Sequence, residues 1–324
     1  MGLNIQKQLE LINHKIANSG FDKKPDELYE PIRYFLQNGG KRLRPLLTIF
    51  GCYLFTDQLE KALKPGIAVE IFHNFTLVHD DIMDNAPIRR GKSTIHEKWD
   101  QNVAILSGDT MLFKSYDYLL DVDASIVNKV ISIFNKCAVK VCEGQQYDMN
   151  FESRETVDES EYIEMIQAKT ASLLGFALHL GALAGGADEK DAELLQKFGL
   201  MLGTGFQLKD DLLDVYGSAD KFGKRVGGDI IANKKTYLLI KALNHADSGQ
   251  QKIITGWLAK KGPAEEKVEQ ITRIYDQIGI KELTESKMNS IFTSGFHYLD
   301  QVNCKNERKK ELIDFSKYLI DRDS

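Results

Sequence analysis

The chain contains little cysteine and little proline. Its 324 residues include 4 cysteines and 6 prolines. The cysteines (Cys52, Cys137, Cys142 and Cys304) show neither the paired spacing of a zinc site nor the density of a disulfide framework. We therefore expect thiols in a reducing compartment. Because so few prolines interrupt the chain, it can form long helices.

Long apolar runs and an excess of positive charge are also missing. The most apolar stretch, residues 172–187, is about 16 residues long and contains His179, whereas a bilayer span needs about 20. No apolar stretch follows the first lysine, so we expect no secretory signal. The formal net charge of −5 argues against a nucleic-acid partner. We expect a cytoplasmic protein without stable membrane insertion.

The apolar residues that are present follow the period of an α-helix. Ile5, Leu9, Ile12 and Ile16 are separated by four, three and four residues, which places them on one helix face. Sustained apolar–polar alternation, the pattern of a half-buried strand, is hard to find. No linker or internal repeat divides the chain. The sequence therefore predicts an all-α fold with residues 1–324 in a single domain.

Loops and helix ends are indicated by glycine and by polar residues. We expect loops at residues 85–93 and 217–233, among others. A helix is expected to end at Asn38-Gly39, because glycine readily adopts the left-handed conformation that follows many helices.

A cluster of aspartates follows one apolar helical run. Asp80, Asp81 and Asp84 lie at its end, and Asp80 and Asp84 share a helix face at a separation of about 5–6 Å. Two carboxylates at that separation repel each other unless a cation or a basic group lies between them. A solvated acidic helix end would show the same pattern if it stood alone.

A second cluster has the same spacing. Asp210, Asp211 and Asp214 also follow an apolar helical run, and two such clusters are much less expected by chance. No histidine or cysteine accompanies the acids, which excludes a zinc site. Oxygen ligands alone suit Mg²⁺, which commonly shares its ligands with substrate phosphates. The sequence therefore predicts Mg²⁺ as cofactor.

Basic residues occur close to both clusters along the chain. They are Lys41, Arg42, Arg44, Arg89, Arg90, Lys92, Lys221, Lys224, Arg225, Lys234 and Lys235. Arginine binds phosphate oxygens in pairs and lysine acts as a mobile point charge. Any one of these runs could be a solvated loop. Together with the acids they predict one diphosphate held through Mg²⁺ and another held in a basic pocket. No nucleotide-binding fingerprint is present.

The order of these segments resembles the trans-isoprenyl diphosphate synthases, or polyprenyl synthetases. The matched segments are GGKRLRP (39–45), DDIMD with RRGK (80–92), KTASLL (169–174), GFQLKDDLLD (205–214) and GKRVGGD with KKTY (223–237). The resemblance implies a single bundle of long helices around a central cavity, with the acidic clusters facing each other at its mouth. Such enzymes are usually homodimers and join an allylic diphosphate to isopentenyl diphosphate with release of pyrophosphate.

The resemblance also implies roles for residues within the matched motifs. Three Mg²⁺ ions would be bound by Asp80, Asp84 and Asp210, with support from Asp81, Asp211 and Asp214. The allylic diphosphate would be held by Arg89, Lys169 and Lys234, with Lys235 as the alternative to Lys234. Isopentenyl diphosphate would be held by Gly40, Lys41, Arg44, His73 and Arg90. The reacting carbons would face Thr170 and Gln207, and the second acidic site would be closed by Asp229 and Lys224.

Two phenylalanines are candidates for limiting the length of the product. Phe75 precedes Asp80 by five residues, about 7.5 Å along a helix, and Phe72 lies about 12 Å before it. An aromatic residue at position 75 resembles the archaeal-type short-chain enzymes and implies geranylgeranyl diphosphate, with farnesyl diphosphate next. Thr76 does not match the animal farnesyl pattern of two adjacent aromatics. The alternative is that both phenylalanines are plain core residues.

Two other functions are compatible with part of this pattern. A class I terpene cyclase shares the first acidic motif, but it usually has a different second motif and lacks the GGKRLRP segment. A non-catalytic regulatory subunit of a heteromeric prenyl synthase tends to lose one acidic motif, and both are intact here.

Overall fold

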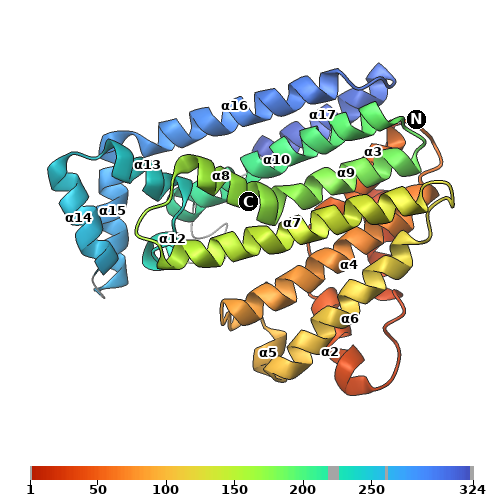
Figure 1. Ribbon diagram of the computed structural model, residues 1–324, viewed down its shortest axis with the longest axis horizontal. Helices are drawn as coiled ribbons and strands as arrows, with labels where there is room; N and C mark the ends of the chain where they lie inside the picture. The colour runs from red at the N-terminus through yellow and green to blue at the C-terminus, as the bar shows by residue number, and fades with distance from the viewer. Residues whose placement is uncertain (1, 218–225, 260–261, 322–324) are drawn as a thin grey trace. The chain divides into compact units, whose positions relative to one another are not determined.

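The computed structural model describes residues 2–217, 226–259 and 262–321. Within these ranges the chain is built from α-helices, and the only strands are the two residues each of β1 and β2 (Figure 1). The all-α prediction is confirmed. The first elements are α1 (Ile5–Ala17), α2 (Asp26–Gln37), α3 (Leu43–Tyr53), α4 (Glu60–Met83), β1 (Ile88–Arg89), β2 (Lys92–Ser93), α5 (Ile95–Lys98), α6 (Gln101–Leu119) and α7 (Val127–Ser153).

The second half of the chain continues in the same way. Its elements are α8 (Glu159–Ile166), the π-helix η1 (Gln167–Ala171), α9 (Ser172–Ala184), α10 (Glu189–Tyr216), α12 (Gly228–Ile231), α13 (Tyr237–His245), α14 (Ser248–Ala259), α15 (Ala264–Ile278), α16 (Ile280–Asp300) and α17 (Asn306–Asp321). Among the described residues, no helix is both long enough and apolar enough to cross a membrane.

The helices group into two compact units. Unit 1 comprises Met1–Lys136, Phe176–Gln196 and Val302–Leu312, and unit 2 comprises Cys137–Gly175, Lys197–Gln301 and Ile313–Ser324, each within the described ranges. The helices α7, α9, α10 and α17 contribute residues to both. That residues 1–324 act as one domain stays a prediction.

Helix α4 lies at the core of unit 1. It packs against α3 and α6, and its middle section is buried on all sides, which is why its apolar residues do not form a single stripe. Phe72 is 1% exposed, and its ring centroid lies 5.0 Å from that of Phe134 in an edge-on contact. The apolar core therefore extends to within two helical turns of Asp80.

The helical pattern read at the N-terminus is confirmed. In α1, Ile12 and Ile16 are buried and Ile5 and Leu9 are partly buried, as expected for one face. Helix α2 ends at Gln37, and Gly39 follows with a φ of 76°, as the Asn38-Gly39 prediction requires. The residues that precede the GGKRLRP segment are therefore fixed by ordinary helix packing and capping.

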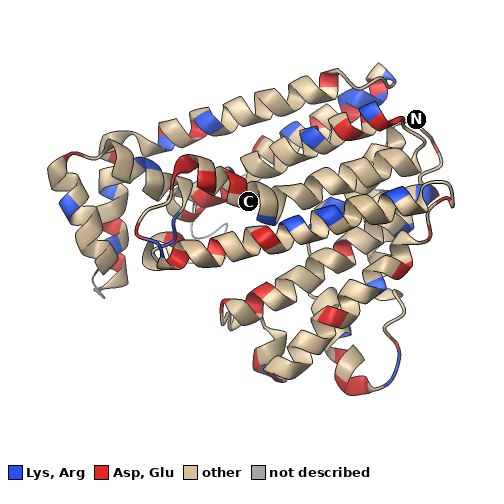
Figure 2. Ribbon diagram, in the orientation of Figure 1, with Lys and Arg blue, Asp and Glu red and all other residues tan. Residues whose placement is uncertain are grey.

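The long apolar stretch of the sequence forms α9. No residue of this helix is charged, so its ribbon is drawn without red or blue in Figure 2. Phe176, Ala177, Leu178 and Leu180 are fully buried. The stretch therefore forms a helix that is buried in the core.

Unit 2 contains two apolar clusters. One gathers α13, α14 and α15 around Leu238, Ile254, Ile271 and Tyr275. In the other, Tyr162 and Met165 of α8 pack against Leu208 of α10 and Tyr237 of α13. The second cluster fixes the direction of α8, and η1 continues directly from it.

Candidate active site

The first acidic cluster lies at the C-terminal end of α4, as predicted. Asp80 and Asp81 belong to the last turn, and Asp84 caps the helix. Asp81 is 1% exposed, whereas Asp84 is exposed and Asp80 is intermediate. This difference follows from helix geometry, because residues i and i+4 share a face and residue i+1 points elsewhere. Asp80 and Asp84 therefore form the more accessible pair.

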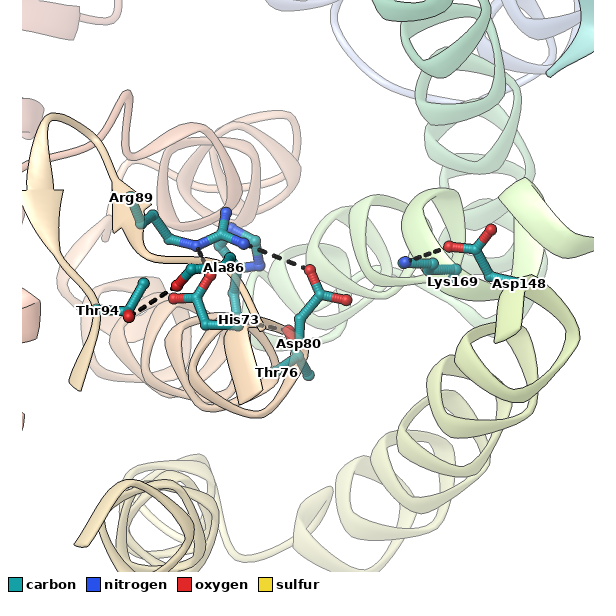
Figure 3. Close-up of polar contacts among 9 residues, drawn as sticks. His73, Thr76, Asp80, Ala86, Arg89, Thr94, Asp148 and Lys169 are labelled. Atoms are coloured by element: carbon teal, nitrogen blue, oxygen red, sulfur yellow. Dashed lines mark hydrogen bonds and ion pairs between the residues drawn. The ribbon is translucent and has the colours of Figure 1, made fainter. Parts of the chain in front are cut away.

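Arg89 is the basic partner of this cluster. Its Nε donates to Oδ1 of Asp81 at 2.6 Å, and its Nη2 lies 3.4 Å from Oδ2 of Asp80 (Figure 3). Burial raises the pKa of Asp81, and the charge and hydrogen bond of Arg89 act in the opposite direction. Among the described residues, no hydrogen-bond donor reaches the buried Oδ2 of Asp81.

A short hairpin holds Arg89 in place. We predicted a plain loop at residues 85–93, which was incomplete, because β1 and β2 pair there in antiparallel fashion. The connecting Arg90 and Gly91 have φ values of 53° and 74°, and two positive φ values are what the tight turn of a two-residue hairpin needs. Oγ1 of Thr94 donates to the carbonyl of Ala86 at 2.8 Å and closes the base of the hairpin (Figure 3). Two-residue strands are too short to show an alternating pattern in sequence.

The GGKRLRP and IRRGK segments meet in unit 1. The guanidinium group of Arg90 donates to the carbonyl of Gly39. A Cβ placed on Gly40 would lie 3.2 Å from both terminal nitrogens of Arg90, and Gly40 has a φ of 143°. Glycine is needed there both for its conformation and for the close approach. Lys41 follows as an exposed residue.

His73 lies beside the same arginines. Burial, followed by the charges of Arg44 and Arg90, holds the pKa of His73 well below its ordinary value. The imidazole is therefore neutral near pH 7 and can both donate and accept a hydrogen bond. Its backbone carbonyl accepts from Oγ1 of Thr76 at 2.8 Å (Figure 3). The residues that the resemblance assigns to isopentenyl diphosphate are thus brought together, and their binding role stays a prediction.

The second acidic cluster lies near the end of α10, in unit 2. Asp211 is 4% exposed, whereas Asp210 is exposed and Asp214 is intermediate. The middle aspartate points inward here too. The hydroxyl of Tyr162 and Nε2 of Gln207, the latter at 3.2 Å, donate to its carboxylate. Burial raises the pKa of Asp211 to about 7, against the opposing effect of the hydrogen bond from Tyr162.

The π-helix η1 positions the next two predicted residues. Nζ of Lys169 donates to Oδ2 of Asp148 at 2.6 Å (Figure 3), and Oγ1 of Thr170 donates to Oε1 of Gln207 at 3.3 Å. Single turns of π-helix often occur at functional sites, because the wider turn changes the direction of its side chains. Here the wider turn includes both Lys169 and Thr170.

A small pocket in unit 2 gathers these groups. Its polar lining consists of Asp148, Tyr162, Lys169, Thr170, Gln207, Asp211, Lys234, Lys235 and Thr236. Both lysines of the Lys-Lys-Thr run reach it, so the choice of Lys234 over Lys235 stays a prediction. Nζ of Lys234 lies 4.0 Å from Oδ1 of Asp229.

Residues 227–229 contact the second cluster through their backbone. The backbone N–H of Asp229 donates to Oδ2 of Asp214 at 2.8 Å, and the N–H of Gly227 donates to the carbonyl of Asp214. Asp229 therefore lies at the second cluster, as the resemblance implies. Lys224, which was assigned to the same site, lies outside the described residues.

The sequence reasoning missed Asp148, Tyr162 and Gly144. A Cβ on Gly144 would lie 2.2 Å from the backbone nitrogen of Lys169, so glycine alone permits this contact between α7 and η1. The available signal was a glycine inside a helix followed by polar residues at 145–148. Nothing in the sequence indicates that Tyr162 contacts Asp211.

The carboxylates fit Mg²⁺ better than a metal that needs a full cage of protein ligands. Among the described residues, no group of three or more His, Cys, Asp or Glu side chains is close enough to hold a metal ion by itself. Mg²⁺ usually keeps several waters and takes one or two carboxylates together with substrate phosphates. The accessible aspartates Asp80, Asp84 and Asp210 match this donor set.

Comparison with known proteins decides the family. The polyprenyl synthetase family model matches residues 25–275. The chain belongs to the polyprenyl synthetase family. It is 36% identical to the geranylgeranyl pyrophosphate synthase of Geoglobus acetivorans over 98% of both chains, and 38% identical to the geranylgeranyl diphosphate synthase of Methanosarcina mazei over 93% of this chain and 91% of that protein.

A solved structure agrees with the sequence comparison. A crystal structure of a geranylgeranyl pyrophosphate synthase has a TM-score of 0.94 and 40% identity, and the match covers 99% of this chain and 100% of that one. The predicted membership of the polyprenyl synthetases is therefore confirmed. That the two acidic clusters face each other across one cavity stays a prediction.

Proposed function

We propose that the protein is a short-chain trans-prenyltransferase that joins isopentenyl diphosphate to an allylic diphosphate and releases pyrophosphate. The proposal is supported above all by the assembly of both aspartate clusters with basic partners. Arg89 reaches Asp80 and Asp81, and Lys234 lies beside Asp229. Family membership makes the same reaction class the expected one.

The first task of the site is to hold the leaving pyrophosphate. In this proposal Asp80, Asp84 and Asp210 hold three Mg²⁺ ions, which supply positive charge to the departing group. Arg89, Lys169 and Lys234 bind its oxygens directly. Fixed charges of this kind stabilise the charge that develops as the carbon–oxygen bond breaks, because they need not reorganise. When the diphosphate binds, Lys169 leaves its ion pair with Asp148 and contacts the diphosphate instead.

The second task is to stabilise the allylic cation and to position the nucleophile. Thr170 and Gln207 direct their dipoles at the cation, and apolar walls exclude the water that would quench it. Lys41, Arg44, Arg90 and the neutral His73 hold isopentenyl diphosphate, whose double bond then attacks. Holding two reactants in place can contribute about 7–11 kcal/mol to catalysis. The departing pyrophosphate takes the proton that is lost.

The product in this proposal is geranylgeranyl diphosphate, with farnesyl diphosphate next. Phe75 lies five residues before Asp80 on α4 and is 9% exposed. Its ring centroid is 5.4 Å from that of Phe72 and 4.8 Å from that of His79. An aromatic ring held from both sides has little freedom to move away from a growing prenyl chain.

The protein acts as a homodimer in this proposal. Helix α6 exposes Leu106, Phe113 and Leu120, with exposed fractions of 58%, 71% and 55%. Leu106 and Phe113 are seven residues apart on the helix, and Leu120 follows at the same interval just beyond its end, so the three lie along nearly one face. Asp109 and Asp117 lie between them on this face, so apolar and polar side chains alternate along it. Large apolar side chains with exposed fractions this high support a protein interface on this face. The occupant that fits the family is a second copy of the chain.

The location in this proposal is the cytoplasm. All four cysteines are free thiols, and Cys52 and Cys137 are buried. Free thiols in this number are typical of proteins from a reducing compartment.

Product analysis tests the proposed function. The purified chain would be incubated with Mg²⁺, isopentenyl diphosphate and each allylic starter of five, ten or fifteen carbons, and the dephosphorylated products would be separated by chromatography. We expect linear geranylgeraniol, loss of turnover with a chelator and recovery with excess Mg²⁺. Cyclic hydrocarbons would indicate a terpene cyclase. Complete inactivity of the lone chain would indicate a regulatory subunit.

A further inference from the structure

Arg42 is the more deeply buried of the two arginines in the GGKRLRP segment. It is 4% exposed, whereas Lys41 before it is exposed. It immediately precedes α3 and has a φ of 48°, in the left-handed region. A side chain other than glycine adopts this conformation only when its surroundings hold it there.

The guanidinium group of Arg42 connects three other helices. Its Nε donates to Oδ1 of Asn13 on α1 at 3.0 Å, and its Nη1 donates to Oε1 of Glu70 on α4 at 2.8 Å. Its Nη2 donates to the carbonyl of Leu36 on α2 at 2.9 Å. The planar guanidinium group has donors in fixed directions, so these three acceptors together define its position and that of its backbone.

Packing alone does not hold this turn. A cavity of about 350 Å³ adjoins it and is lined by Asn13, Leu36, Gly39 and Arg42, among others. Apolar side chains therefore do not fill the space behind the turn. The hydrogen bonds of Arg42 therefore act on a turn that has unfilled space on one side.

A gain in stability does not by itself explain the buried ion pair between Arg42 and Glu70. The side chains of Arg42 and Glu70 are 4% and 3% exposed. Removing two charges from water costs so much that an apolar pair of similar size is often at least as stable. A role in fixing one conformation explains the pair better than a gain in stability.

The pair lies directly beside the proposed isopentenyl diphosphate pocket. Glu70 precedes His73 by three residues on α4, so the two side chains are neighbours on the helix surface. The charges of Glu70 and Arg42 both act on Arg90, the first raising its pKa and the second lowering it. Arg90 in turn contacts Gly39 and Gly40.

We propose that Arg42 and Glu70 form a positioning pair that holds the turn of residues 39–44 so that Lys41 and Arg44 can bind isopentenyl diphosphate. The inference rests on the proposed function. Arg42 does not touch the substrate. Glu70 balances the charge of Arg42. The three buried hydrogen bonds of the Arg42 guanidinium group fix the backbone from which Lys41 and Arg44 extend.

The test compares Arg42→Lys and Glu70→Gln with the unaltered chain. Lysine keeps the charge but cannot reach three acceptors in fixed directions. For Arg42→Lys we expect the KM for isopentenyl diphosphate to rise about tenfold, as loss of a charged hydrogen bond would cause. The KM for the allylic substrate and kcat should change less than about twofold. Glu70→Gln should also raise the KM for isopentenyl diphosphate.

Arg308→Lys is the matched control. Arg308 is also buried and donates to the carbonyl of Tyr53 and to Asp57, at the opposite end of α3. Its replacement should lower the thermal stability as Arg42→Lys does, and leave the KM for isopentenyl diphosphate unchanged. An equal rise of that KM in the control, or no rise in Arg42→Lys, would overturn the proposal.

Two further measurements keep the test decisive. If Arg42→Lys does not fold, the double variant Arg42→Gln/Glu70→Gln leaves no unpaired charge in the core and should show the same selective rise in KM.

If the unaltered chain shows no prenyl transfer, the proposed function fails by itself. Hydrogen exchange at residues 40–44 then still tests the positioning role. Faster exchange in Arg42→Lys than in the unaltered chain supports it, and equal exchange overturns it.

Discussion

Asp80 and Asp81 are adjacent in sequence but differ in environment. Asp81 is buried against Arg89, and Asp80 keeps part of its carboxylate accessible. The second cluster repeats this arrangement, with Asp211 buried and Asp210 exposed. At the residue scale, each cluster therefore combines accessible carboxylates with one buried carboxylate that accepts hydrogen bonds from side chains of the protein.

The accessible carboxylates should determine turnover more than stability. We expect Asp80→Ala to lower kcat by about 10²–10³-fold, as loss of a group that stabilises transition-state charge does. The free energy of unfolding should change by less than about 1 kcal/mol, because the contact between Asp80 and Arg89 is long and partly exposed. Steady-state kinetics and urea unfolding would measure the two effects.

Glu269→Ala is the control for that variant. Glu269 pairs with Arg273 on α15 and its side chain is 74% exposed. Its removal should leave kcat unchanged. Turnover close to that of the unaltered chain in Asp80→Ala would show that Asp80 holds no metal.

The buried Asp211 should make the stability of the metal-free protein depend on pH. Burial raises its pKa in the folded protein to about 7, whereas an aspartate in an unfolded chain has a pKa of about 3.8. The folded state therefore binds the proton more tightly, so this contribution to stability is fully present below about pH 4 and is lost as the pH rises through about 7. The loss is at most about 1.4 kcal/mol per pH unit.

Asp211→Asn removes this titration. The free energy of unfolding of the unaltered chain minus that of the variant should therefore fall between pH 5 and pH 8, measured by urea unfolding with a chelator present. A difference that stays constant over this range would contradict the prediction.

At the element scale, the site depends on how η1 approaches α7. The wide turn that includes Lys169 and Thr170 lies against Gly144, and no other residue type leaves room for that contact. The second acidic cluster and the two catalytic candidates are thus positioned by helix packing and by one glycine.

Replacing this glycine should disturb catalysis through the backbone. We expect Gly144→Ala to destabilise the protein by about 1–3 kcal/mol, because the added carbon overfills the contact. Turnover should fall as Lys169 and Thr170 are displaced. Thermal unfolding and kinetics would measure both.

Gly256→Ala provides the matched control. Gly256 lies inside α14 and a Cβ there would meet nothing within 4 Å. The substitution should stabilise the protein by up to about 1 kcal/mol, through helix propensity, and leave turnover unchanged. If Gly144→Ala behaved like this control, the close approach would have no functional importance.

Helix α4 should also set the length of the product. We expect Phe75→Ala to shift the product toward longer prenyl chains, because it removes the ring one to two turns before Asp80. The substitution should also cost about 3–5 kcal/mol of stability, as is usual for a buried phenylalanine. Chromatography of the dephosphorylated products would show the shift.

Phe21→Ala separates the two effects. Phe21 is 3% exposed and lies between α1 and α2, so its loss should lower stability without changing the product. An unchanged product profile in Phe75→Ala would show that Phe75 is a plain core residue.

At the scale of the whole molecule, α6 exposes large apolar side chains that a second copy of the chain would cover in the proposed dimer. Leu106 and Phe113 are among the most exposed apolar residues that the structure describes. The double variant Leu106→Glu/Phe113→Glu should convert a dimer into single chains of 36.7 kDa, because charges cannot be buried in such an interface unpaired. Light scattering after size-exclusion chromatography would measure the mass.

Ile253→Glu is the control for the dimer prediction. Ile253 is 44% exposed on α14. Its replacement should leave the mass of the assembly unchanged. A dimer that persists in the α6 double variant would place the interface elsewhere.

The sequence by itself determined the helical fold and the helix ends on which the candidate aspartates lie. The 3.6-residue period survives in α1 because one face is buried, and the spacing of four residues puts Asp80 and Asp84 on one side of a helix without reference to the rest of the chain. Motif order was enough to select Arg90 and His73, which the structure brings together.

Only the tertiary structure decided which residues of a motif point inward. Arg42 and Lys41 are adjacent and both carry a positive charge, yet one is bound to Glu70 in the core and the other is exposed. Tyr162 reaches Asp211 from 49 residues away, and Asp148 reaches Lys169 from 21. Such pairings depend on the directions of packed helices, and no local period or spacing in the sequence encodes them.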